Sequence, residues 1–172
     1  MRRPYLLPML LGTLASAPVL AQQPLDSLVD TAVTTPLPPT PEQEHYLQGL
    51  RTAGRGVAQM KSGIDRVVRA KSGGDTLELR QAGRRLAGLC VAARGFLASG
   101  RSRMALNAYD APTRKPARDL AFRLDSLVTH ARACQHGAGR TPEASAVELL
   151  EEIQAYEKAL AEFRTAIGLP NR

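Results

Sequence analysis

The chain has 172 residues, with 23 Lys and Arg against 16 Asp and Glu, which gives a net charge of +7. Trp is absent and only four Tyr and three Phe occur, so any core must be built mainly from aliphatic side chains. A chain of this length suits one domain and can bury a core without structural metals or many disulfides.

Residues 1–21 have the three parts of a cleavable secretory signal peptide. Arg2 and Arg3 supply the positive start, an uncharged apolar stretch follows, and Ala21 ends a small-residue cleavage site. An uncleaved membrane anchor is the alternative, but Pro18 interrupts the stretch, and a spanning helix needs about 20 apolar residues. We therefore expect export to the periplasm or the cell exterior after cleavage near Ala21, with no stable membrane insertion afterwards.

Residues 22–40 predict a flexible, disordered tether. They contain four Pro and four Thr with little apolar periodicity, which is typical of an extended spacer. The remaining residues, 41–172, are expected to form one helical domain, with helices at about 41–71, 76–105, 113–135 and 142–167.

The helix expected at 41–71 opens with a start signal in which Thr40 is the N-cap and Gln43 completes a capping box. Apolar residues follow at alternating spacings of four and three, as in a coiled-coil heptad. They are Tyr46, Leu50, Ala53, Val57, Met60, Ile64 and Val67.

The helix expected at 76–105 follows a Ser-Gly-Gly break and begins with a second capping box at Asp75. Its predicted seam is Leu79, Ala82, Leu86, Leu89, Ala93 and Phe96. Two glycine stripes with a spacing of seven accompany these helices, at Gly49, Gly56 and Gly63 and at Gly88 and Gly95. Close helix packing is the favoured interpretation of both stripes, and a groove for a partner is the alternative.

The last two expected helices carry similar seams. The seam at 113–135 is Ala117, Leu120, Leu124, Leu127, Ala131 and Cys134. The helix at 142–167 starts at Thr141 and carries Ala146, Leu149, Ile153, Tyr156, Leu160, Phe163 and Ile167. Four amphipathic helices joined by short turns predict an all-α, antiparallel up-down-up-down four-helix bundle. A three-helix or hairpin arrangement that dimerises is the rival, so a monomer and a homodimer both stay open.

Cys90 and Cys134 are expected to form a disulfide, because an exported protein meets an oxidising compartment. The two residues lie equally far from a turn near Pro112, so an antiparallel hairpin brings them to the same height. An intermolecular disulfide is one alternative. A zinc or copper site of Cys90, Cys134 and His130 is another, since His130 and Cys134 share a helix face.

Other chemistry finds little support, and we expect neither a cofactor nor an enzyme. The Cys-x-x-Cys-His signature of covalent haem is absent, and Met60 is more typical of core filler than of a haem ligand. No nucleophile motif, zinc-protease motif or phosphate loop occurs. A small-cofactor carrier, of haem or metal, remains the alternative function.

The positive charge is concentrated in the middle of the chain. Residues 51–140 hold 18 Lys and Arg against 6 Asp and Glu, whereas the two flanks are acidic. One interpretation is that the acidic last helix neutralises the basic ones. The other is an exposed basic face, with candidates Arg80, Arg84, Arg94 and Arg123, for an unknown protein or an anionic envelope component. Nucleic acid is not expected as a partner of an exported chain without a recognition motif. The resulting hypothesis is a non-catalytic exported bundle that binds an acidic partner.

Overall fold

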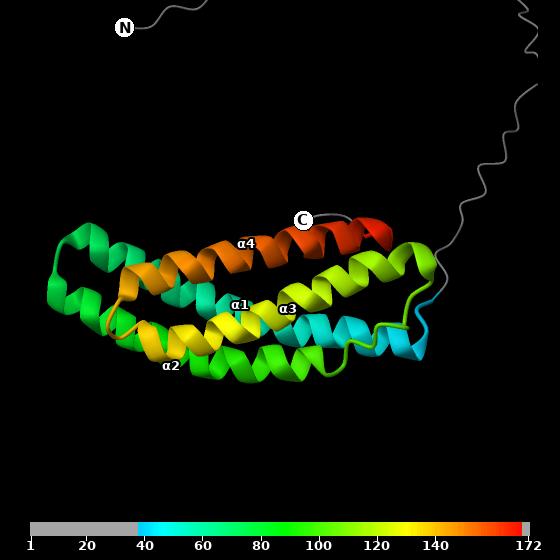
Figure 1. The fold of residues 1–172 in the computed structure, drawn as a ribbon, viewed down its shortest axis with the longest axis horizontal. Helices are drawn as coiled ribbons and strands as arrows, with labels where there is room; N and C mark the ends of the chain where they lie inside the picture. Colours follow the sequence, from blue (N-terminus) through cyan, green and yellow to red (C-terminus); the bar gives the residue numbers. More distant parts are fainter. Residues whose placement is uncertain (1–37, 170–172) are drawn as a thin grey trace, which may run out of the picture. The chain divides into compact units, whose positions relative to one another are not determined.

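The computed structural model describes residues 38–169. The predicted signal peptide (1–21) and nearly all of the predicted tether (22–40) lie outside the described residues, as do residues 170–172. The described part of the chain is all-α, with four helices and no strand (Figure 1). The helices are α1 (Pro41–Gly73), α2 (Thr76–Arg101), α3 (Ala111–Gly137) and α4 (Pro142–Ala166). Among these four, none is both long and apolar enough to cross a membrane.

Side-chain caps begin three of the helices. The Thr40 hydroxyl accepts a bond from the Gln43 N–H and the Gln43 side chain accepts one from the Thr40 N–H, which completes the capping box at α1. The Asp75 carboxylate accepts bonds from two backbone N–H groups of α2, and the Asp110 carboxylate accepts one at α3. Thr141 differs, because its hydroxyl donates backward to the Gly137 carbonyl and caps nothing on α4.

The connection between α2 and α3 is longer than its sequence suggests. Helix α2 ends at Arg101, four residues before the expected end, and α3 begins at Ala111, two residues before the expected start. Between them Met104, Ala108 and Tyr109 are buried. The chain therefore leaves the helix so that this segment can pack its apolar side chains into the core.

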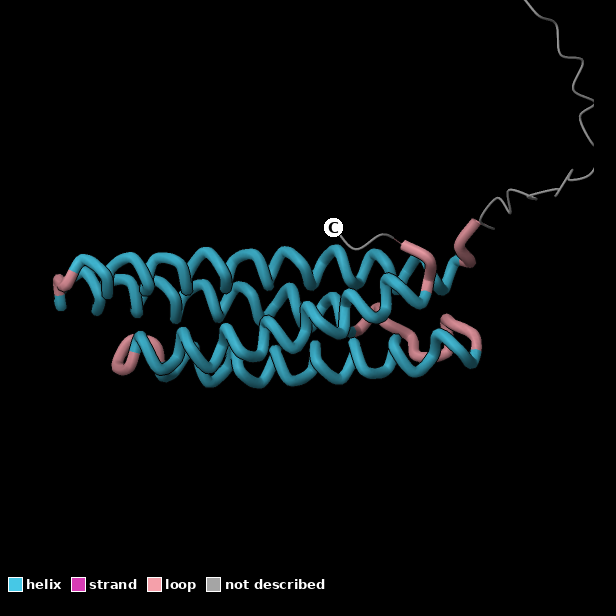
Figure 2. Tube along the Cα trace, turned by 90° about the horizontal axis from the view of Figure 1, so that it is seen from above, coloured by secondary structure: helices cyan, strands magenta, loops and turns pink. Residues whose placement is uncertain are grey.

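Residues far apart in the sequence meet where the four helices pack together. Figure 2 shows the helices lying side by side along their length. On α1 and α2, Gly49 meets Gly100 and Gly63 meets Leu86. The other meeting pairs are Cys90 with Cys134, Ser126 with Glu152, and Lys61 with Glu157.

The core is aliphatic and follows the predicted seams closely in α3, where all six seam residues are buried. In α2 the prediction of Phe96 as a core residue is wrong, because Phe96 is only half-buried while Leu97 and Cys90 are fully buried. The buried face of α2 is rotated relative to the predicted seam, because this helix packs against α1 and α3 at the same time. Three aromatic rings, Tyr46, Tyr109 and Phe163, pack at 5.1 to 5.2 Å near the ends of α1 and α4.

The two predicted glycine stripes have different environments. Gly49, Gly56 and Gly63 are buried against α2, and a β-carbon on Gly56 would lie 2.9 Å from the Ala93 carbonyl oxygen. Gly88 and Gly95 are exposed, with nothing within 4 Å of such a carbon. The α1 stripe thus permits close helix packing, whereas the α2 stripe faces away from the other helices and takes no part in it.

Candidate binding surface

Arginines carry most of the positive charge, yet few of them meet a carboxylate. Within residues 38–169, the ion pairs are Lys61–Glu157, Lys71–Glu143, Arg101–Asp125, Lys115–Asp119 and a long His130–Glu152 contact. Arg101 is thus the single arginine of the described segment that takes part in an ion pair. The acidic face of α4 therefore leaves the other arginines of that segment without a counter-ion.

The four arginines predicted as a basic face do not form one surface. Arg80 and Arg84 are exposed one turn apart on α2, and Arg84 lies against the α3–α4 connection at Gly139. Arg94 is half-buried and donates a 2.9 Å hydrogen bond to the Gln135 side chain. Arg123 lies elsewhere, in a depression between α3 and α4, with its guanidinium 6.0 Å from the Phe122 ring centroid.

A closer gathering of arginines lies between α1 and α2. Arg66 and Arg69 from α1 and Arg85 from α2 line one pocket of about 160 Å³, which we call the arginine pocket. The rest of its lining comes from Glu78, Gln81 and Ala82. Three guanidinium groups against one carboxylate leave the pocket with a net charge of about +2.

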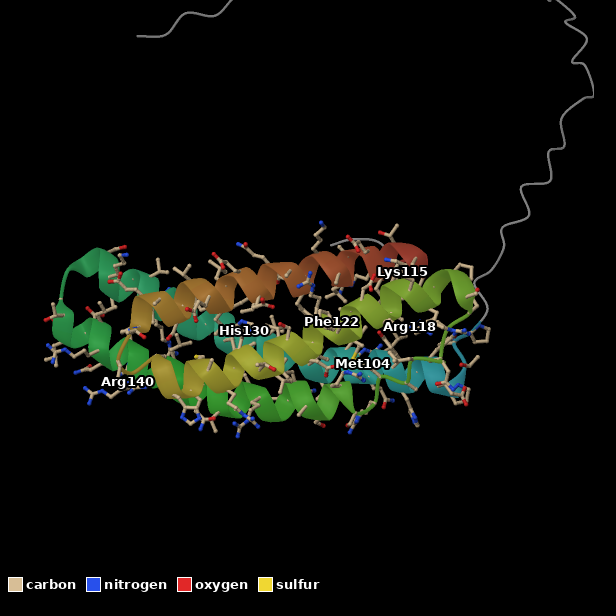
Figure 3. All side chains as sticks on the ribbon, viewed as in Figure 1. Met104, Lys115, Arg118, Phe122, His130 and Arg140 are labelled. Atoms are coloured by element: carbon tan, nitrogen blue, oxygen red, sulfur yellow. A yellow bond between two sulfur atoms is a disulfide. The ribbon has the colours of Figure 1, made fainter. Side chains whose placement is uncertain are left out.

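The arginine pocket belongs to a broader basic end of the molecule. Arg80, Arg84 and Arg140 lie at the end of the described helices where α1 turns into α2 and α3 turns into α4 (Figure 3 marks Arg140). Nitrogen-tipped side chains also project from the outer side of α2 in this view. Like charges held close together without counter-ions raise the local positive potential, which favours an anionic ligand.

Sequence reasoning overlooked Arg66, Arg69 and Arg85, although the chain carried a signal for them. The predicted seams contain Val67 on the first helix and Leu86 on the second, and each neighbours one of these arginines. Residues equally far from a turn lie at the same height in an antiparallel hairpin, as was argued for the two cysteines. Applied to the Gly73–Gly74 turn, the same reasoning places residues 66–69 opposite the start of α2. The charge totals alone could not reveal this gathering, because they do not distinguish faces.

The chemistry of the arginine pocket is that of anion recognition. A guanidinium presents a planar fork of donors that matches the oxygens of a carboxylate or phosphate. Gln81 adds a neutral side chain that can donate or accept. Glu78 is the one carboxylate of this lining, and no Ser, Cys, Thr or His side chain lines the pocket beside it. The arrangement therefore supports binding of an anion.

The cysteines form the predicted intramolecular disulfide, Cys90–Cys134, with their Cα atoms 6.2 Å apart. The alternative metal site loses two of its three ligands to this bond. His130 Nδ1 instead contacts the Ser126 carbonyl oxygen at 3.0 Å. In residues 38–169 no group of three or more His, Cys, Asp or Glu side chains is arranged to hold a metal ion. Met60, the candidate haem ligand, is fully buried in the aliphatic core.

Ser126, His130 and Glu152 approach one another between α3 and α4, a cluster that the sequence did not reveal. The Ser126 hydroxyl donates a 2.9 Å hydrogen bond to Glu152 and lies 3.5 Å from His130 Nδ1. Because Nδ1 bonds a carbonyl oxygen, it carries the proton and cannot accept one from the hydroxyl. The cluster therefore joins two helices and lacks the geometry of an activated serine.

Comparisons with known proteins identify no relative. No family model matches the chain, and neither a curated protein nor a solved structure does.

Proposed function

We propose that this protein is an exported, non-catalytic, up-down-up-down helical bundle that binds an anionic envelope component at its basic end. The observation that carries the proposal is the arginine pocket, where Arg66, Arg69 and Arg85 converge without an ion-pair partner in the described residues. An anionic lipid head group or an anionic polysaccharide presents the oxygens that such a pocket binds.

Export is supported by the Cys90–Cys134 disulfide, since such bonds persist in oxidising compartments. It is supported too by Arg2, Arg3 and the uncharged stretch after them. Cell fractionation and N-terminal sequencing test it, and we expect the mature chain outside the cytoplasm to begin near Gln22. A cytoplasmic chain that retains Met1 or Arg2 contradicts the proposal.

Binding is tested with a triple variant, Arg66→Gln, Arg69→Gln and Arg85→Gln. The control, Arg55→Gln, Arg118→Gln and Arg132→Gln, removes the same charge from exposed arginines that do not line the arginine pocket. Each arginine near an anionic surface contributes about 1 kcal/mol, so three together contribute about 100-fold in affinity.

The measurement is co-sedimentation with phosphatidylglycerol vesicles and retention on dextran sulfate resin, each at low and high salt. We expect the arginine-pocket variant to lose binding to one of these probes and the control to keep it. High salt weakens binding of the unmodified chain because it screens exposed charges. Equal losses of binding in the two variants indicate a diffuse charge effect and refute binding at the arginine pocket. If the unmodified chain binds neither probe at low salt, the proposed function is refuted.

A further inference from the structure

A second, apolar groove runs between α1 and α4, away from the basic end. It has a volume of about 450 Å³, within the range of about 300 to 1,000 Å³ typical of small-molecule sites. Apolar side chains make up most of its lining, among them Leu47, Leu50, Val57, Leu160, Phe163 and Ile167. An apolar ligand that covers this surface removes it from water, which is energetically favourable.

Gly54 lines the groove and contributes no side chain to fill it. Nothing lies within 4 Å of the position that a β-carbon would take on Gly54. Gly54 is exposed, whereas its neighbour Val57 on the same helix is buried. The hollow therefore results in part from a glycine that helix packing does not require, unlike the buried glycines of α1.

Charged side chains are placed unevenly along the groove. The Lys61–Glu157 ion pair, at 2.9 Å, crosses it from α1 to α4 and neutralises both groups. Arg51 and Arg164 also line the groove, and neither has an ion-pair partner among the described residues. The groove is thus apolar with two uncompensated positive charges, which complements a ligand that combines an apolar chain with an anionic group.

The spacing of these charges fits one extended hydrocarbon chain. Arg51 lies ten residues before Lys61 on α1, which is about 15 Å along a helix axis. Arg164 lies seven residues after Glu157 on the antiparallel α4, about 10 Å in the same direction. An acyl chain that spans one leaflet of a bilayer is about 15 Å long, half of the hydrocarbon thickness.

From these observations we propose that the α1–α4 groove binds a single-chain amphiphile with an anionic head. Arg51 and Arg164 hold the carboxylate or phosphate, and the chain lies over Gly54 and Val57 toward the Lys61–Glu157 pair. This site is independent of the arginine pocket, since Arg66, Arg69 and Arg85 do not line it.

The experiment measures binding of soluble amphiphiles to the purified chain by isothermal titration calorimetry. Dodecanoate and dodecyl phosphate present the two anionic heads on one chain length. Dodecyl maltoside carries a neutral head, and acetate and inorganic phosphate carry no chain. We expect one equivalent of dodecanoate or dodecyl phosphate to bind, the maltoside to bind at least about tenfold more weakly, and the chainless anions to give no heat at this site.

Two pairs of variants locate the site. Gly54→Phe fills the groove, while Gly88→Phe makes the same change at an exposed α2 position that is equally free of neighbours. We expect Gly54→Phe to weaken dodecanoate binding at least tenfold and Gly88→Phe to leave it unchanged, with circular dichroism showing both folded. The pair Arg51→Gln and Arg164→Gln should reduce the preference for dodecanoate over dodecyl maltoside, and the exposed pair Arg55→Gln and Arg132→Gln should not.

Other results overturn the proposal. Equal binding of dodecyl maltoside and dodecanoate would show that the site does not recognise an anionic head. Equal losses of binding in Gly54→Phe and Gly88→Phe would show that the ligand does not bind in the groove. If dodecanoate does not bind and Gly54→Phe converts a dimer into a monomer in sedimentation, the groove is a contact between copies of this chain. Loss of vesicle binding in the arginine-pocket variant leaves all of these outcomes unaffected, so the two sites are tested separately.

Discussion

The carbonyl oxygen of Gly100 lies 2.5 Å from the point where a β-carbon on Gly49 would stand, and the Gly49 carbonyl lies 2.6 Å from the same point on Gly100. Helices α1 and α2 therefore meet backbone to backbone at this level. Any side chain on either residue must push the helices apart, because a backbone carbonyl cannot rotate away as a flexible side chain can. Each glycine here permits a contact that no other residue type allows.

Alanine substitution should therefore act oppositely at buried and exposed glycines. We expect Gly49→Ala to lower the free energy of unfolding by about 1 to 3 kcal/mol through overpacking. Gly88→Ala, on the open face of α2, should raise it by about 0.5 to 1 kcal/mol because alanine favours the helix. Urea denaturation of both variants measures the difference, and a gain in stability at Gly49 contradicts the close approach.

Reduction of the Cys90–Cys134 bond should destabilise the bundle strongly. The bond joins residues 44 positions apart, and the chain-entropy model assigns a loop of this size about 4 kcal/mol. We expect urea denaturation with reductant to give a free energy of unfolding lower by this amount. The matched control is Cys90→Ala with Cys134→Ala, which should not respond to reductant. A response equal to that of the unmodified chain would show that the reductant acts elsewhere.

Alkaline pH should destabilise the folded chain through its buried tyrosines. Burial raises the pKa of Tyr156 to about 12 and that of Tyr109 to about 12 from the ordinary value of 10.0. Burial, aided by neighbouring tyrosines, also raises the pKa of Tyr46. Between pH 10 and 12 the unfolded chain loses these protons while the folded chain keeps them, so stability falls by up to about 1.4 kcal/mol per pH unit for each tyrosine.

Two phenylalanine variants separate this effect from hydrogen bonding. Tyr156 has no hydrogen bond to another described residue, so Tyr156→Phe should leave stability at pH 7 unchanged and make the alkaline loss less steep. The Tyr46 hydroxyl donates a buried 2.8 Å hydrogen bond to the Ala117 carbonyl, so Tyr46→Phe should cost about 1 kcal/mol at pH 7. Denaturant titrations from pH 7 to 12 measure both, and parallel pH profiles for Tyr156→Phe and the unmodified chain refute the assignment.

The helix caps should differ in their contribution to stability. The Asp75 carboxylate accepts bonds of 2.7 and 3.2 Å from the N–H groups of Leu77 and Glu78, so Asp75→Ala should cost about 1 kcal/mol. Thr141→Ala should cost less than about 0.5 kcal/mol, because the Thr141 side chain accepts no N–H bond from α4. Thermal and urea unfolding compare the two, and equal losses would count against this difference between the caps.

The sequence predicted the four helices, the seam of α3 and the disulfide, because periodicity and equal spacing from a turn are properties of the chain itself. It did not predict that Leu97 rather than Phe96 is buried, since the orientation of α2 depends on two neighbouring helices at once. The same limit applies to Gly88 and Gly95, which share the sequence pattern of the α1 glycines but face outward. The arginine pocket was missed because its members come from two helices and meet only after those helices pair.

The Cys90–Cys134 bond closes residues 90–134 into a covalent ring, with α1 and the first half of α2 as one arm and α4 as the other. A protease that cuts the α2–α3 connection opens this ring without releasing a fragment. The nicked molecule keeps its full mass on a non-reducing gel and separates into two pieces only after reduction. The peptide bonds of the longest connection between the helices are thus dispensable for keeping the four helices in one molecule.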